Sequence, residues 1–299
     1  MIALLAALLL DAALGEPDAI WRRVPHPAVL MGRAVARLER AMNRGGARRA
    51  KGAAAVALLT AGAAAAGWAI SLVPFGAAVG AAILLAQRSL AQHVGAVAAG
   101  LRAGLPEGRA AVARIVGRDT AAMDGPAIAR AAIESAAENL SDGVVAPAFW
   151  FAVGGLPAMA AYKALNTADS MIGHRTPRHE AFGWAAARAD DVANLIPARL
   201  TALAIAALHG GLTGWTEIAW EARLHRSPNA GWPEAAAARA LGVALSGPRS
   251  YAGRPEPAPF VHPAGRRDPG PGEIDAAVRL LWRTWGTLTG IVALVALAA

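Results

Sequence analysis

The chain of 299 residues contains no cysteine, and only two of its 29 basic side chains are lysines. The absence of cysteine excludes disulfide bonds, thiolate metal sites and a cysteine nucleophile. Charged residues are also scarce, at 17%, whereas apolar residues reach 56%. A typical soluble domain has about 25% charged and about 45–50% apolar residues. This composition excludes intrinsic disorder and leaves two alternatives, a membrane protein or an alanine-rich soluble helical protein.

Several well-known functional motifs are also missing. The sequence has no GxxxxGK[ST] phosphate loop, no HExxH zinc motif and no GxSxG nucleophile turn. Any nucleotide must therefore be held by another arrangement. The formal net charge is +8, but the basic residues are spread over several apolar-flanked loops and form no nucleic-acid-binding motif. We therefore expect no nucleic-acid partner.

The most prominent feature of the sequence is a set of long apolar segments. They lie near residues 1–14, 52–87, 143–162, 200–216 and 284–299. A helix needs about 20 apolar residues to cross the hydrocarbon core of a bilayer. The pattern predicts an all-α polytopic integral membrane protein, a single domain over residues 1–299 with about four or five membrane segments and helical cytoplasmic loops. The N-terminal segment has no basic region before it and no clear cleavage site, so we expect it to be retained.

Two of the apolar segments contain breaks. Segment 52–87 is too long for one upright crossing and slightly short for two, so it predicts a helical hairpin that turns near residues 73–76. A tilted span followed by an interfacial helix is the alternative. Segment 143–162 contains Pro147, Gly154, Gly155 and Pro157. Because such residues are tolerated at membrane depth only where the freed backbone groups are covered, we expect a kinked or re-entrant segment that folds back near residues 154–157.

The loop over residues 15–51 is strongly basic. It holds nine arginine and lysine side chains against three carboxylates. An excess of positive charge marks cytoplasmic loops, so this loop is predicted to face the cytoplasm of a multi-pass inner-membrane protein. Within it, His26 lies between two prolines. The interpretations are a rigid turn or a contact with a ligand.

A polar helix precedes the broken segment. Asp124 with a proline two residues later is a good helix start, so a helix is predicted over about residues 126–140. Three charged side chains share one face of it: Arg130, Glu134 and Glu138. Together with Asp142 they place carboxylates just before the membrane segment, which favours a functional site. A solvated helix face with Arg–Glu pairing is the alternative.

A second polar group follows the broken segment. On one predicted helix face lie Asn166, Asp169, Ser170 and Gly173. Asp190 and Asn194 are one turn apart, directly before the next apolar segment. Ionisable groups at membrane depth are functional candidates, and carboxylates with amide and hydroxyl partners suit Mg²⁺. Helix capping at the membrane interface is the alternative.

Five long stretches of the sequence resemble one protein family. They are LLLDAALGEPDAIWRRVPHPAVLMGR, VGRDTAAMDGPAIARAAIESAAENLSDGVVAPAFW, YKALNTADSMIGHR, FGWAAARADDVANLIPARLTAL and RSPNAGWPEAAAARALGVALSGPRSYAG. In this order they cover most of the chain, which resembles the adenosylcobinamide-phosphate synthase family of cobalamin biosynthesis (the CbiB/CobD family of bacterial inner-membrane proteins). The alanine-rich run over residues 51–85 and the proline-rich stretch over residues 256–272 match poorly.

The resemblance implies an ATP-dependent acid–amine ligase. Such an enzyme joins a propionate carboxylate of adenosylcobyric acid to the amine of (R)-1-amino-2-propanol O-2-phosphate, giving adenosylcobinamide phosphate. The carboxylate must first be activated, as an acyl phosphate or an adenylate. ATP and Mg²⁺ are the implied cofactors. Besides these small molecules, the resemblance suggests the lipid bilayer and other late-stage cobalamin enzymes as partners.

The resemblance and the polar groups together suggest roles for individual residues. Catalysis is expected of Glu134, Glu138, Asp142, Asp169 and Asp191. Metal binding is expected of Glu138, Asp142, Asp169 and Asp190. Phosphate groups are expected to contact Arg118, Lys163, Arg175 and Arg199. The remaining substrate contacts are expected from His26, Asn139, Asn166, Ser170 and Asn194.

Two other classes of function remain as alternatives. Broken helices with polar residues are also typical of transporters, but the sequence has no internal repeat or inverted pair of apolar segments. A non-catalytic membrane scaffold of related fold is the second alternative. A scaffold has no need of the acidic side chains that both polar groups contain.

Overall fold

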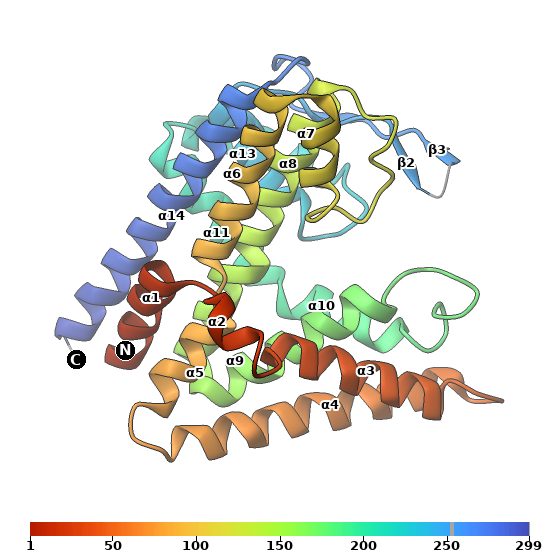
Figure 1. Ribbon diagram of the computed structural model, residues 1–299, viewed down its shortest axis with the longest axis vertical. Coiled ribbons are helices and arrows are strands. Elements are labelled where there is room, and N and C mark those ends of the chain that lie inside the picture. Colours follow the sequence, from red (N-terminus) through yellow and green to blue (C-terminus); the bar gives the residue numbers. More distant parts are fainter. Residues whose placement is uncertain (252–253, 299) are drawn as a thin grey trace. The chain divides into compact units, whose positions relative to one another are not determined.

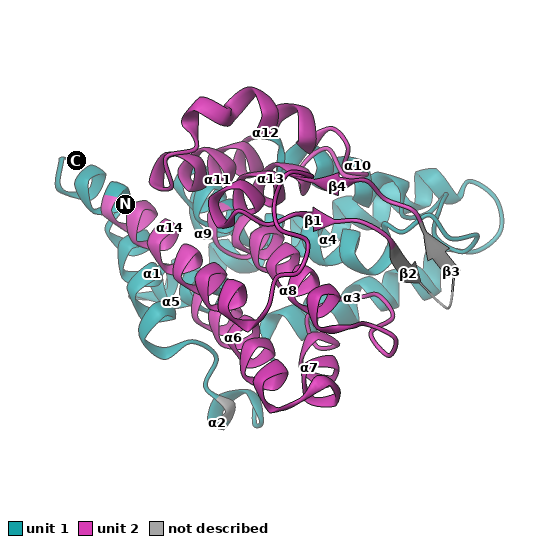
Figure 2. Ribbon diagram, turned by 90° about the horizontal axis from the view of Figure 1, so that it is seen from above, with its two compact units in different colours: residues 1–86, 146–195, 291–299 teal, residues 87–145, 196–290 magenta. Residues whose placement is uncertain are grey.

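The computed structural model describes residues 1–251 and 254–298, which are predominantly helical (Figure 1). The chain divides into two compact units, and Figure 2 colours them separately. Unit 1 comprises residues 1–86, 146–195 and 291–299, and unit 2 comprises residues 87–145 and 196–290. Each unit is assembled from separate stretches of the chain. The prediction of one domain over residues 1–299 is not tested by this division and stays a prediction.

Unit 1 is built from helices. They are α1 (Ile2–Leu14), α2 (Asp18–Trp21), α3 (Pro27–Met42), α4 (Arg48–Ser71), α5 (Gly76–Leu84), α9 (Ala146–Ile172) and α10 (Trp184–Ala193). The second half of α9 lies along α4. Along this contact Gly67 faces the backbone of Leu156, and nearer the start of α4 Gly52 faces the carbonyl of Phe182, in the turn before α10. Because glycine has no Cβ, the two segments approach closely at both points.

The apolar core of unit 1 lies where α3, α4 and α9 meet. Its largest members include Val35, Leu59, Leu165 and the fully buried Phe182. The core residues on α3, α4 and α9 come from one face of each helix, so the core fixes how these helices face one another. The polar side chains of α9 and α10 are held on this framework.

Unit 2 has α8 at its centre. Its elements are α6 (Gln87–Ala103), α7 (Leu105–Val112), α8 (Gly125–Leu140), a π-helical turn (Ser141–Val145), α11 (Leu195–Leu208, from residue 196), a 3₁₀ turn (Leu212–Gly214), α12 (Trp215–Ala222), α13 (Gly231–Leu241) and α14 (Pro271–Ala298, up to residue 290). Two short antiparallel ladders join β1 (Leu245–Ser246) to β4 (Phe260–Val261) and β2 (Arg249–Tyr251) to β3 (Arg254–Glu256). Apolar residues on most sides of α8, including Ile128, Ile133 and Leu140, are fully buried.

The helix start predicted at Asp124 is confirmed. Its carboxylate accepts a hydrogen bond of 2.8 Å from the backbone N–H of Ala127, and α8 begins at Gly125, directly after Asp124. An aspartate in this position satisfies an N–H group that has no partner inside the helix.

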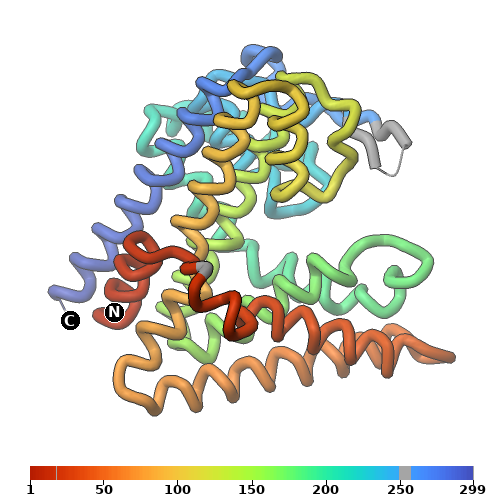
Figure 3. The backbone as a smooth tube through the Cα atoms, viewed as in Figure 1, coloured from red at the N-terminus to blue at the C-terminus, as the bar shows by residue number. Residues whose placement is uncertain are grey.

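The break predicted in segment 143–162 is also confirmed. The backbone leaves helical geometry at Gly154 (φ −147°, ψ 26°) and Gly155 (φ 65°, ψ −162°), so α9 consists of two helical pieces joined by a kink, whose path can be followed in Figure 3. The conformation of Gly155 is almost restricted to glycine because a Cβ would collide with the backbone. A straight crossing helix is therefore excluded.

Among the residues that the structure describes, three helices are by length and composition able to cross a membrane: α4, the continuous stretch over residues 125–172, and α14. The pair α10 and α11 is bent by 44° and gives a fourth when taken as one broken span. These match four of the five predicted segments, and the fifth, α1, is shorter, with 13 residues. The chain is an all-α polytopic membrane protein.

The predicted turn in segment 52–87 lies where the sequence placed it, between α4 and α5. The second arm of the hairpin is short, because α5 covers nine residues and ends at Leu84. At 1.5 Å per residue such a helix spans roughly 14 Å, about half of a hydrocarbon core. The segment therefore provides one long helix and one short one.

Candidate functional site

A chain of hydrogen bonds links α9 to α10 in unit 1. Tyr162 donates its hydroxyl to Asn194 Oδ1 over 2.9 Å, and Asn194 Nδ2 donates to Asp190 Oδ2 over 3.0 Å. The other oxygen of Asp190 accepts from Asn166 Nδ2 over 3.3 Å. Tyr162, Asp190 and Asn194 are all buried. The carboxylate of Asp190 is thus fixed from both sides by amide groups.

Asp169 lies one turn beyond Asn166 on α9 and interacts electrostatically with Asp190. Gly173 follows it, and a Cβ at that position would collide with the Asp169 carboxylate. Asp191 is half-buried and pairs with Arg188 over 3.2 Å. Two aspartates that repel each other beside amide groups form an oxygen-rich site of the kind that favours a divalent cation.

Several predicted contacts for substrate lie close to this network along the chain. Lys163 is half-buried on α9, and Ser170 is exposed and donates to the carbonyl of Asn166. Arg175 is exposed and lines a pocket of about 240 Å³ together with Arg49, Trp184 and Arg188. Unit 1 thus brings Asp169, Asp190, Asp191, Asn166 and Asn194 together on two neighbouring helices, with arginines nearby in sequence.

Unit 2 holds a buried ion pair between α8 and the loop before it. Arg118 and Glu134 are 2.6 Å apart, and both side chains are almost fully buried. The second oxygen of Glu134 accepts from the backbone N–H of Ser246 over 2.7 Å. The interpretation of this helix face as solvated is wrong for Glu134, because only 4% of its surface is exposed. Glu134, which was predicted for catalysis, and Arg118, which was predicted to bind phosphate, thus form an ion pair with each other.

The face of α8 beyond Glu134 is more open. Glu138 and Asn139 are exposed, and Asn139 Nδ2 donates to the carbonyl and hydroxyl oxygens of Ser135. Asp142 is half-buried and lies on the π-helical turn that ends α8. Single π-helical turns inside helices are frequent at functional sites. Glu138, Asn139 and Asp142 therefore remain accessible candidates in this unit.

Two further candidates have local roles. Arg199 lies over the ring of Trp232, with 4.7 Å from its guanidinium carbon to the ring centroid, and donates to Asn229 over 3.4 Å. His26 caps α3, because its Nδ1 accepts from the N–H of Ala28 over 3.2 Å. The edge of its ring packs against Trp21. The rigid turn predicted at His26 is thus the start of a helix.

The residues described by the structure contain no group of three or more histidine, aspartate or glutamate side chains placed to hold a metal ion. Of the four carboxylates predicted for Mg²⁺, Asp169 and Asp190 belong to unit 1, and Glu138 and Asp142 belong to unit 2. A cation of this kind is commonly held by one or two carboxylates together with substrate phosphates and water. The pair Asp169 and Asp190 fits that smaller donor set.

Comparison with known proteins decides the family. The CobD/Cbib protein model matches residues 4–281. The cobalamin biosynthesis protein CobD of Rhizobium meliloti is 50% identical, over 97% of this chain and 94% of its own length. The proteins of that name from Brucella suis and Rhodobacter capsulatus are 49% and 48% identical, each over 98% of this chain and 95% and 96% of their own lengths. The chain belongs to the CobD/CbiB family. No solved structure matches it.

Membership of the CobD/CbiB family places the chain in cobalamin biosynthesis. The family match includes every candidate residue from His26 to Arg199. Tyr162 joins the network without having been predicted, although it lies four residues before Asn166 and therefore on the same helix face. The contact of Glu134 with the backbone N–H of Ser246 is also new, and the sequence carries no signal for it.

Proposed function

We propose that this CobD/CbiB protein is an adenosylcobinamide-phosphate synthase. It forms the amide bond between a propionate carboxylate of adenosylcobyric acid and the amine of (R)-1-amino-2-propanol O-2-phosphate, with ATP as energy source. The observation that carries the proposal is the family membership over nearly the whole chain, combined with the buried carboxylate–amide network of unit 1.

The proposed chemistry needs an activated carboxyl group and a neutral amine. The amine nitrogen attacks the carboxyl carbon, the C–N bond forms, and the bond from that carbon to its phosphate-bearing leaving group breaks. The proton lost by the nitrogen passes to a carboxylate. Asp191 suits this step, because it is half-buried and lies beside the fixed Asp190.

The network around Asp190 would hold its carboxylate still while substrate binds. Asn166 and Asn194 each donate to one of its oxygens, and Tyr162 fixes Asn194. Mg²⁺, when bound, would be held by Asp169 and Asp190 and would neutralise nucleotide phosphates. Arg175 and Lys163 would contact phosphate oxygens, since guanidinium and ammonium groups stabilise charge that develops on them. Glu138 and Asp142 remain proposed for the same reaction.

An assay of the purified full chain in detergent tests the proposal. The protein is incubated with adenosylcobyric acid, the amino alcohol phosphate, ATP and Mg²⁺, and adenosylcobinamide phosphate is measured by mass spectrometry. Asp169→Asn and Asp190→Asn keep the shape of each side chain but remove its charge, so we expect about a hundredfold less product from each. Glu217→Gln removes an exposed carboxylate of α12 and should leave synthesis unchanged.

Two results would contradict the proposal. If the wild-type chain makes no product under these conditions, the reaction is wrong. If wild type is active and both aspartate variants keep full activity, the reaction stands but the site in unit 1 is wrong. A parallel reaction with unphosphorylated amino alcohol reports which form of the amine is used.

A further inference from the structure

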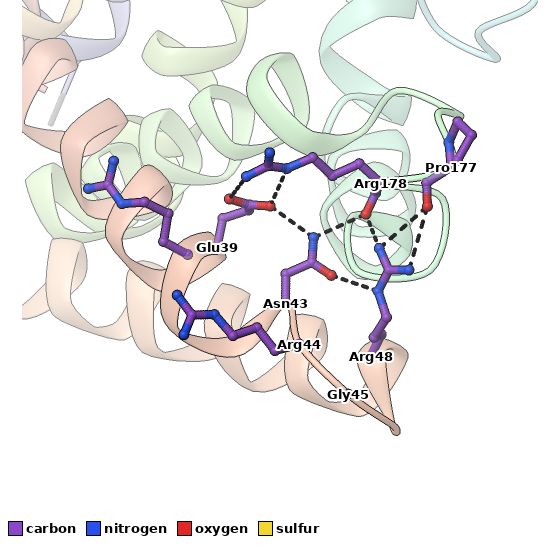
Figure 4. A pocket seen from close by; sticks show the side chains of 8 residues that line it. Glu39, Asn43, Arg44, Gly45, Arg48, Pro177 and Arg178 are labelled. Atoms are coloured by element: carbon purple, nitrogen blue, oxygen red, sulfur yellow. Dashed lines mark hydrogen bonds and ion pairs between the residues drawn. The ribbon is translucent and has the colours of Figure 1, made fainter.

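An arginine-lined pocket lies in unit 1, where the end of α3 and the start of α4 meet the loop after α9 (Figure 4). Its volume is about 470 Å³. The lining residues are Glu39, Arg40, Asn43, Arg44, Gly45, Arg48, Pro177 and Arg178. The lining thus contains four arginines and one carboxylate. None of these residues belongs to the network around Asp190.

Two of the four arginines are fixed by the protein itself. Arg178 donates to both oxygens of Glu39, each over 2.8 Å, which neutralises the single carboxylate of the pocket. Arg48 donates from Nε to Asn43 Oδ1 over 2.7 Å and from its terminal nitrogen to the carbonyl of Arg178. Asn43 in turn donates to Glu39 and to the same carbonyl. The wall of the pocket is therefore built before any ligand arrives.

The other two arginines have no such partner. Arg40 lies near the end of α3, and Arg44 lies in the turn that follows this helix. Both side chains are exposed, and neither guanidinium group forms a hydrogen bond or ion pair with a residue that the structure describes. Both guanidinium groups therefore keep their full set of donors. Two positive groups that line one pocket repel each other. An anion with several oxygen atoms would satisfy both.

We propose that this pocket binds a phosphate group, with Arg40 and Arg44 as its direct ligands. Arg48 and Arg178 supply fixed positive charge beside it. A phosphate ester presents several acceptor oxygens, so it can accept from two guanidinium forks at once, whereas a carboxylate is satisfied by one fork. The ester can belong to a soluble small molecule or to a lipid headgroup. The second source fits the position of Arg48 at the first residue of α4, a helix long enough to cross a membrane.

The test uses the purified full chain and two probes. Glycerol 3-phosphate is titrated into the protein in detergent by calorimetry, which reports a soluble ester. Nanodiscs of phosphatidylcholine with or without phosphatidic acid, followed by native mass spectrometry, report a bound lipid phosphate. The key variant is Arg40→Gln with Arg44→Gln. The matched control is Arg33→Gln with Arg37→Gln, which removes the same charge from α3 at two exposed positions outside the pocket.

We expect wild type and the control to bind at least one probe equally, and the pocket variant to bind it at least about tenfold more weakly. Binding of glycerol 3-phosphate identifies a soluble ester, and selective retention of phosphatidic acid identifies a lipid. No binding of either probe by wild type overturns the proposal. Equal loss in both double variants also overturns it, because diffuse surface charge then explains the binding.

Should the glutamine variant fail to fold, Arg40→Lys with Arg44→Lys keeps the charge, and undiminished binding there contradicts the role of the guanidinium forks. The measurement reads binding alone, so its failure leaves the proposed synthase activity untouched.

Discussion

The hydroxyl of Tyr162 donates to Asn194 in the buried network that fixes Asp190. Tyr162→Phe removes this donor and leaves Asn194 Oδ1, which is buried, without it. An unsatisfied buried polar group costs about 1–3 kcal/mol, so we expect the thermal unfolding temperature in detergent to fall. Synthesis should fall as well, because Asn194 and then Asp190 lose their fixed orientation.

A hydroxyl on the same helix provides the comparison for Tyr162. Ser170 is exposed and donates only within α9, to the carbonyl of Asn166. Ser170→Ala should therefore change the unfolding temperature little. An unfolding temperature for Tyr162→Phe equal to that of wild type would show that the network does not stabilise the fold.

The ion pair between Glu39 and Arg178 predicts a dependence of stability on pH. The two hydrogen bonds from Arg178, together with one from Asn43, lower the pKa of Glu39 to about 2. Glu39 is on α3, which lies outside the candidate membrane-crossing helices. A lowered pKa in the folded state means that the stabilisation is complete above the ordinary value of 4.5 and is lost as the pH falls toward 2. Because Arg178 is largely exposed, solvent screens the pair, and its contribution to stability at pH 7 is smaller than that of a buried pair.

Thermal unfolding between pH 7 and pH 3 measures this effect. Glu39→Gln should unfold at a lower temperature than wild type at pH 7, and the difference should shrink toward pH 3. Arg178→Gln breaks the same pair and should give a similarly flattened profile. A constant difference between wild type and Glu39→Gln across this range would mean that Glu39 does not titrate through the pair.

Single residues differ in how far the sequence predicts their roles. Helical spacing placed Asn166 and Asp169 on one face and Asp190 and Asn194 one turn apart, and both pairs join one network in unit 1. Spacing along one helix carries no information about partners from distant segments. The pairing of Arg118 with Glu134 and that of Glu39 with Arg178 therefore appear only in the folded chain.

At the scale of elements, the contact between α4 and α9 depends on Gly67. A Cβ at this position would lie 2.8 Å from the carbonyl oxygen of Leu156 and 3.0 Å from Pro157 Cα, and neither backbone atom can move aside as a side chain would. Overpacking of this kind typically costs about 1–3 kcal/mol. Gly67→Ala should therefore lower the unfolding temperature and separate the two helices.

The same helix carries a matched control. Gly62 also lies in α4, and a Cβ there would meet nothing within 4 Å. Gly62→Ala replaces a glycine inside a helix by the best helix former, so it should leave the unfolding temperature unchanged or raise it slightly. If both variants behave alike, close approach of α9 is not what Gly67 provides.

The elements show which sequence signals are reliable. The cap at Asp124 and the break at Gly154–Gly155 were predictable because both depend on local backbone chemistry. The end of α5 at Leu84 and the π-helical turn over residues 141–145 were not, since no residue type marks them and packing decides them. Apolar composition indicates where membrane helices lie, whereas their ends depend on the folded context.

At the scale of the whole molecule, the predicted orientation of the basic loop over residues 15–51 remains open to a direct test. The helix α4 has 24 residues and is therefore roughly 36 Å long, more than the hydrocarbon core of about 30 Å. If α4 crosses the membrane, its two ends lie on opposite sides. The excess of arginine in the loop before it predicts that the Arg48 end is cytoplasmic.

The absence of cysteine makes the measurement simple, because one introduced thiol is the only one in the chain. Gly46 precedes α4 and has open space around a Cβ, and Val73 follows α4 and is 60% exposed. In intact spheroplasts, a membrane-impermeant maleimide should label Val73→Cys and leave Gly46→Cys unlabelled, and in inverted inner-membrane vesicles the pattern should reverse. Labelling of both thiols from one side would mean that α4 does not cross the bilayer. The opposite pattern would place the arginine-lined pocket on the outer side of the membrane, away from cytoplasmic phosphate esters. The topology therefore also limits which ligand that pocket can meet.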